Sequence, residues 1–134
     1  MRTLLICLLA SAPIALAQDN PLSAFNKRAY GQIKQWLLHS AEKMPEENYS
    51  FKPTESVRGF GQVLGHVSDV QYLFCSSVLG EKNPAPKIEQ TKTSKDDLIA
   101  SLKAAFAYCD KAYDGMTDAA APDWSSSLGT IRPN

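Results

Sequence analysis

The sequence has no excess of charge of either sign. Fourteen Lys and Arg residues balance fourteen Asp and Glu residues in a chain of 134, so the formal net charge is zero. Domains that bind nucleic acid or anionic membranes through charge carry a basic surplus, which this chain lacks. We therefore expect no nucleic-acid partner. The hydrophobic share of 44% and the charged share of 21% are those of a globular protein rather than a disordered one, and the length suits one domain.

Common catalytic motifs are also missing. The sequence contains no G-x-S-x-G, no phosphate-binding loop, no C-x-x-C and no H-E-x-x-H, which removes the usual signatures of serine hydrolases, nucleotide-binding proteins, thioredoxin-like proteins and zinc proteases. Only two histidines are present, His39 and His66.

The N-terminal residues have the pattern of a secretory signal. Arg2 is the only charge before an apolar run from Thr3 to Ala17, and the run ends in Ala15-Leu16-Ala17. This order of charge, apolar segment and small residues is typical of a signal peptide. The run is shorter than the roughly 20 residues that span a membrane. We expect residues 1–17 to be removed and the mature protein to be periplasmic or secreted, without a transmembrane segment. The alternative is an N-terminal membrane anchor.

Cleavage would leave two cysteines, Cys75 and Cys109. An exported protein meets oxidising conditions, so an even pair of cysteines predicts a disulfide. The alternative is a pair of buried free thiols that act as small apolar residues.

Apolar residues at steps of three and four predict three helices, and no segment has the alternation of a strand. The first runs from Pro21 to about Lys43, the second from about Arg58 to Leu79, and the third follows a Ser94 cap and ends at Gly115. The expected apolar face of the first helix is Leu22, Phe25, Ala29, Ile33, Trp36, Leu37 and Ser40. That of the second is Phe60, Val63, Leu64, Val67, Val70, Leu73, Phe74 and Val78. That of the third is Leu98, Leu102, Ala105, Phe106, Cys109, Ala112 and Tyr113.

The segments between and after these helices have no such periodicity. Residues 44–57 form a connector, in which we expect Tyr49 and Phe51 to pack against the body of the protein. Residues 81–93 form a polar loop, and residues 119–134 an irregular tail. Three helices with wide apolar faces need a further partner to close a core, and the tail does not supply it.

The cysteine positions bear on topology. If the second and third helices run parallel, Cys75 and Cys109 differ in height by about 4.5 Å. In an antiparallel hairpin they would differ by roughly 16 Å, which is too far for a disulfide. A disulfide therefore predicts that the 81–93 loop crosses back along the bundle.

His66 is the candidate metal ligand. It lies at the edge of the second helix's apolar face, where an imidazole can bind a divalent metal through one ring nitrogen. The alternative is a histidine that only hydrogen-bonds a neighbour. Asp69 could orient or share that ligand. Nearby Gly59, Gly61 and Gly65 predict that something approaches the backbone closely, and we favour a neighbouring helix over a ligand.

Two blocks of the sequence resemble the DinB family, in a secreted branch. The first is Met44-Pro45-Glu46-Glu47-x-Tyr49-x-Phe51-Lys52-Pro53. The second, from Val57-Arg58-x-Phe60-Gly61, includes Gly65-His66-Val67-x-Asp69. Weaker similarity continues to Tyr108-Cys109-Asp110, so that the resemblance covers about residues 21–118.

The resemblance implies an all-α fold: an up-down-down-up four-helix bundle with a long crossover between helices two and three. Here only three helices are clear, so residues 18–118 would form an incomplete domain. Members of the family typically hold a divalent metal with three histidines, and His66 occupies the position of the one from helix two. The other two come from a His-x-x-x-His on helix four, a pair this sequence lacks. The resemblance therefore implies a zinc or nickel site with an incomplete set of ligands.

For function, the resemblance implies a metal-dependent hydrolase or thiol transferase in the intact form, acting on a small molecule or thiol. One alternative is a non-catalytic secreted module that binds a partner or a lipid-like ligand in an apolar groove. Another is a truncated product without function. An open bundle would expose apolar residues and favour self-association, and we expect this of Ile33, Trp36, Leu64 and Phe106.

Overall fold

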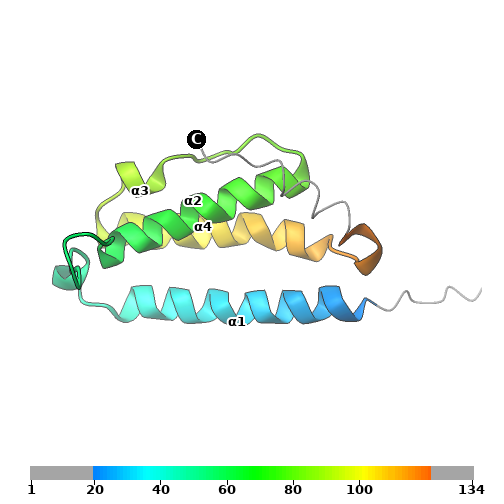
Figure 1. Ribbon diagram of the computed structural model, residues 1–134, viewed down its shortest axis with the longest axis horizontal. Helices are drawn as coiled ribbons and strands as arrows, with labels where there is room; N and C mark the ends of the chain where they lie inside the picture. Colours follow the sequence, from blue (N-terminus) through cyan, green and yellow to red (C-terminus); the bar gives the residue numbers. More distant parts are fainter. Residues whose placement is uncertain (1–19, 122–134) are drawn as a thin grey trace, which may run out of the picture.

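A computed structural model describes residues 20–121, which form helices and connecting segments without a strand. Figure 1 shows the arrangement, and the elements in chain order are α1 (Pro21–Lys43), η1 (Glu46–Asn48), α2 (Phe60–Leu79), α3 (Ile88–Thr91), α4 (Lys95–Asp114) and η2 (Asp118–Ala120). The predicted signal peptide and residues 122–134 of the predicted tail lie outside the described residues. Within residues 20–121, no helix is long and apolar enough to cross a membrane.

The three long helices are those that the sequence predicts, and their ends follow local rules. Gly80 ends α2 in a left-handed conformation with a φ of 67°, which glycine adopts without steric cost. The Ser94 side chain accepts a hydrogen bond from the Asp97 backbone N–H and so caps α4. The second helix begins two residues later than predicted, at Phe60, because backbone oxygens of the connector accept the first N–H groups of the helix.

The helix α4 packs against both other long helices. It runs parallel to α2 and antiparallel to α1, and residues 81–94 cross back along the bundle between α2 and α4 (Figure 1). A disulfide joins Cys75 of α2 to Cys109 of α4, with the two Cα atoms 5.3 Å apart. The predicted cysteine pairing and the crossover are thus both present. A bridge over 34 residues stabilises a fold by about 3–4 kcal/mol if it acts mainly on the unfolded chain.

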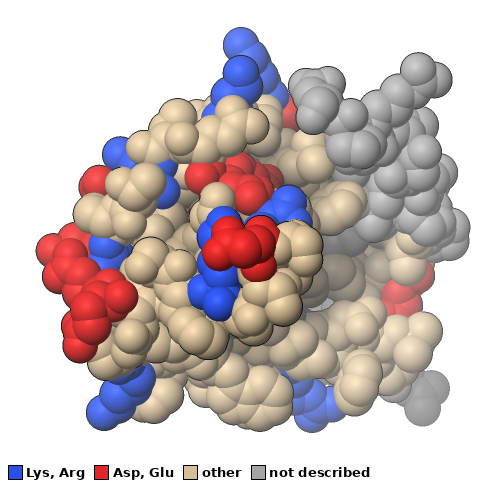
Figure 2. Space-filling model, turned by 60° about the vertical axis from the view of Figure 1, so that its left-hand side comes forward, with Lys and Arg blue, Asp and Glu red and all other residues tan. Residues whose placement is uncertain are grey.

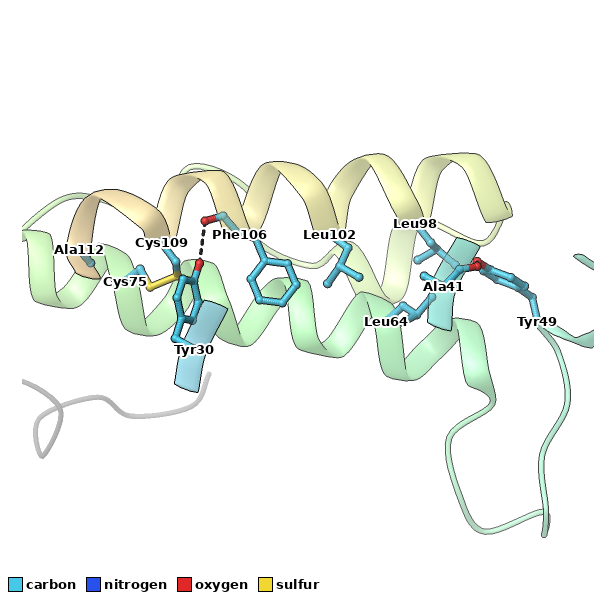
Figure 3. Packing of buried hydrophobic residues seen from close by; sticks show 10 residues of the cluster. All are labelled: Tyr30, Ala41, Tyr49, Leu64, Cys75, Leu98, Leu102, Phe106, Cys109 and Ala112. Carbon is cyan, nitrogen blue, oxygen red and sulfur yellow. Dashed lines mark hydrogen bonds between the residues drawn. A yellow bond between two sulfur atoms is a disulfide. The ribbon is translucent and has the colours of Figure 1, made fainter. Parts of the chain in front are cut away.

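The core lies mainly between α2 and α4, with Tyr49 at one end and Tyr30 beside the disulfide near the other (Figure 3). Leu64, Leu102 and Phe106 are buried in it. The Tyr30 hydroxyl donates to the Phe106 carbonyl at 2.8 Å, and the Tyr49 hydroxyl donates to the Ala41 carbonyl at 2.7 Å. Each tyrosine therefore adds apolar area to the core without leaving its hydroxyl unsatisfied.

The expectation that Leu64 and Phe106 are exposed is wrong, whereas Ile33 and Trp36 are exposed as expected. Leu64 and Phe106 lie in the contact between α2 and α4, which closes without a further helix. The prediction that Phe51 of the connector packs against the body of the protein is also wrong, because its side chain is 60% exposed. Tyr49 is buried, as predicted. Tyr49 is held because its hydroxyl has a partner at the end of α1, which Phe51 cannot have.

The face of α1 that packs is not the predicted apolar face. Trp36 is 63% exposed, and Leu22, Phe25 and Ile33 are exposed with it. The packed side lies about a quarter of a turn or more further round the helix, where Tyr30 and Ala41 are buried and Lys34 pairs with Asp110 at 2.6 Å. Of the predicted face, Leu37 packs against the core. At the start of α1, the Asp118 carboxylate of η2 accepts hydrogen bonds from the backbone and side chain of Ser23.

Candidate functional site around His66

The short helix α3 rests directly on the backbone of α2. A Cβ atom added to Gly65 would lie 2.7 Å from the Cα atom of Glu89, which is closer than side chains pack. Glycine is therefore the residue that lets α3 dock at this position. The close approach predicted for Gly65 is confirmed, and the neighbour is a one-turn helix in the crossover that the sequence did not reveal.

Of the other two glycines of this group, Gly61 faces both the connector and α4, and Gly59 faces the connector. A Cβ atom on Gly61 would lie 3.2 Å from the Tyr49 carbonyl oxygen and 3.1 Å from the Leu98 side chain. One on Gly59 would lie 3.3 Å from the Ser50 carbonyl oxygen. Because these two positions are glycines, residues 49–51 can pack closely against the start of α2.

Asp69 holds the first turn of α3 in place. Its Oδ1 accepts a hydrogen bond from the Ile88 N–H at 2.8 Å, and its Oδ2 accepts one from the Glu89 N–H at 2.9 Å. Both carboxylate oxygens thus satisfy N–H groups at a helix start, which a negative charge also favours. Asp69 was expected to orient His66. Its hydrogen bonds instead hold the crossover, through the Ile88 and Glu89 N–H groups.

His66 has a different partner, Glu89 of α3. The His66 Nδ1 lies 3.0 Å from Glu89 Oε2, and Glu89 Oε1 accepts a hydrogen bond from Arg58 Nε at 2.7 Å. One carboxylate therefore bridges a guanidinium and an imidazole. No pattern in the sequence points to Glu89, since it lies 23 residues beyond His66 in a polar loop.

Glu89 is ionised at neutral pH. Partial burial favours its neutral form, but the hydrogen bonds from Arg58 and His66 outweigh that effect and hold the pKa of Glu89 below its usual value. An ionised carboxylate only accepts hydrogen bonds. The shared proton therefore lies on His66 Nδ1, which donates to Glu89.

The described residues offer one candidate metal ligand rather than a set. The His66 side chain is 43% exposed, and its Nε2 has no hydrogen-bond partner among residues 20–121. An imidazole held in this way fits a ligand position. Within the same residues, however, no three His, Cys, Asp or Glu side chains are placed to hold a metal ion together. His39 lies exposed on α1 and does not join His66, and both cysteine sulfurs are in the disulfide.

A cavity of about 790 Å³ lies at the same end of the molecule. Glu89 forms part of its wall, together with residues of the connector, α2, α3 and α4. Lys52 and Lys92 line it, as do Glu46 and Glu47. Figure 2 turns this end forward and shows acidic and basic side chains interspersed over it. The cavity is large enough for a small polar molecule.

The described residues thus define a class of protein: an all-helical bundle with a crossover, in which a half-exposed histidine lies beside that crossover. The family model of the DinB superfamily matches residues 30–128. The chain belongs to this superfamily. No curated protein and no solved structure matches it.

Proposed function

We propose that this protein acts outside the cytoplasm and that His66 Nε2 is one ligand of a divalent metal ion, zinc or nickel. In this proposal the metal-loaded protein is a hydrolase or thiol transferase that acts on a small molecule or thiol. The observation that supports it most directly is the pairing of His66 Nδ1 with Glu89, which leaves Nε2 without a described partner on a half-exposed ring.

The chain's own residues would present the ligand and shape its surroundings. His66 offers a nitrogen donor on a rigid helix, and Glu89 accepts the proton on the other ring nitrogen. The remaining ligands are not among residues 20–121. A divalent metal in such a site supplies a lowered pKa of a bound water or thiol at neutral pH.

Metal binding tests the proposal. We expect isothermal titration of the purified mature protein with Zn²⁺ or Ni²⁺ to show one tight site per chain that is lost in His66→Ala. His39→Ala is the matched control, since it removes the other histidine of the sequence, from an exposed position on α1. Equal affinity in His66→Ala and the wild type, or no binding by a folded wild type, would contradict the metal proposal.

The proposed location rests on two features. Residues 1–17 have the pattern of a signal peptide, and the Cys75–Cys109 disulfide suits an oxidising compartment. We expect the mass of the mature protein to correspond to a chain that begins at Gln18, with no free thiol detected in denaturant before reduction. A full-length mass, or two free thiols, would argue against export.

A non-catalytic binding module is the second candidate function. The exposed apolar residues of α1 favour it, because Leu22, Phe25 and Trp36 lie on a helix surface that no described residue covers. A folded monomer that binds neither zinc nor nickel would support this candidate over the metal-dependent one.

A further inference from the structure

We propose that Glu89 is the positioning residue of His66, and that the crossover helix α3 exists at this site to deliver its carboxylate to the imidazole. The inference rests on the proposed function of His66 as a metal ligand. It assigns a role to a residue of the crossover rather than of a long helix.

The main chain of Glu89 is anchored independently of its side chain. Its N–H donates to Asp69, and its Cα packs on the backbone at Gly65. The neighbouring Ile88 is buried and also donates its N–H to Asp69. Replacing the Glu89 side chain therefore leaves the docking of α3 with its backbone contacts intact.

The carboxylate itself has a defined orientation. Arg58 Nε donates to Oε1 and His66 Nδ1 to Oε2, so each oxygen has a different partner. The side chain of Glu89 is also mostly buried, at 22% exposed, which strengthens both interactions relative to water. The two contacts hold the carboxylate so that one of its oxygens faces the His66 ring.

This arrangement selects one tautomer of His66. A carboxylate that accepts from Nδ1–H leaves the lone pair on Nε2, and it restrains rotation of the ring. Loss of such an outer-shell carboxylate typically weakens metal binding by about 10–100-fold. The same arrangement exists before any metal binds, so the tautomer of His66 can be measured in the metal-free protein.

The first test reads that tautomer. We expect ¹⁵N NMR of the metal-free protein, at about pH 9 so that histidine is neutral, to show His66 mainly with its proton on Nδ1. His39→Ala assigns the signals, since the sequence has two histidines. Glu89→Ala should shift His66 toward a mixture of tautomers. Glu89→Gln should restore much of the preference, because its amide oxygen still accepts a hydrogen bond.

The matched control is Glu81→Ala, which removes another carboxylate of the crossover loop. Glu81 accepts a hydrogen bond from the Tyr108 hydroxyl at 2.7 Å and has no described contact with His66. It should leave the His66 tautomer unchanged. Circular dichroism should confirm that each variant keeps the helical content of the wild type.

The second test is zinc affinity. Glu89→Ala should raise the dissociation constant about 10–100-fold, Glu89→Gln less, and Glu81→Ala not at all. A wild-type His66 with its proton on Nε2, or a folded Glu89→Ala variant with unchanged tautomer and affinity, would overturn the role of Glu89. If the wild type binds no zinc but its tautomer depends on Glu89, the proposed metal function fails and the positioning of His66 by Glu89 stands.

Discussion

Gly65 is the position at which a single methyl group decides whether the crossover docks. The backbone of α3 occupies the space that any Cβ would need, so that the Gly65-His66-x-x-Asp69 pattern has a structural role at each of its named residues. Gly65 gives α3 room, Asp69 caps its first turn, and His66 meets its carboxylate. The pattern thus organises the contact between α2 and the crossover, whatever else His66 binds.

We expect Gly65→Ala to destabilise the protein by about 1–3 kcal/mol, the usual cost of overpacking, because α3 has to move away from α2. Gly31→Ala is the control: it lies inside α1 with nothing within 4 Å of the added Cβ, and should gain up to about 1 kcal/mol from helix propensity. Urea unfolding measures both changes. Equal stabilisation by the two substitutions would show that α3 is not docked on Gly65.

Among residues, His66 is the candidate that the sequence identified, and Glu89 is the one that it could not. The helical period and the edge of an apolar face place His66 on α2 at a half-exposed position, as the structure has it. Glu89 becomes a partner only because the crossover returns along the bundle. The pairing of residues 23 positions apart across a loop leaves no periodic signal.

At the scale of elements, α4 and α1 show two different outcomes of the same periodicity. The buried residues of α4 are those predicted, including Leu98, Leu102 and Phe106. In α1, the helix is predicted correctly but the packed side is not. The reason is that α4 lies between two neighbours and buries its apolar face. The side of α1 that meets α4 combines apolar contacts of Tyr30 and Ala41 with the ion pair of Lys34, and this mixed composition gives no clear apolar stripe.

The short elements behave differently from the long ones. A helix of four residues such as α3 is too short to show a period, and it depends on tertiary contacts for its stability. The caps of the long helices are local and were predictable from Ser94 and Gly80. Asp118, by contrast, caps α1 from 95 residues away, which no local rule reveals.

At the scale of the whole molecule, the described bundle has α4 between its two long neighbours and leaves apolar residues of both exposed. Trp36 of α1 and Phe74 of α2 are examples. An apolar surface of this kind is typical of an interaction site or of a protein that self-associates. Self-association therefore remains a prediction, and we expect these exposed residues to form the contact.

Paired substitutions distinguish an open surface from a covered one. Phe106→Ala should cost about 3–5 kcal/mol, as truncation of a fully buried phenylalanine does. Trp36→Gln should stay within about 0.5 kcal/mol of the wild type in dilute solution, as surface substitutions do. Urea unfolding at low protein concentration measures both. A loss of several kcal/mol in Trp36→Gln would mean that the α1 surface is covered in the folded monomer.

The order of residues was enough to predict the three long helices, the Ser94 and Gly80 caps and the all-α class. It also predicted the crossover that a Cys75–Cys109 disulfide requires. These features depend on contacts three or four residues apart, or on the lengths of helices and loops, both of which are written in the order of residues. The tertiary structure decided which side of α1 is buried, where α3 docks and which carboxylate meets His66. Those features depend on how α4 and the crossover lie against residues distant in sequence, as the backbone contact at Gly65 and the ion pair of Lys34 with Asp110 show.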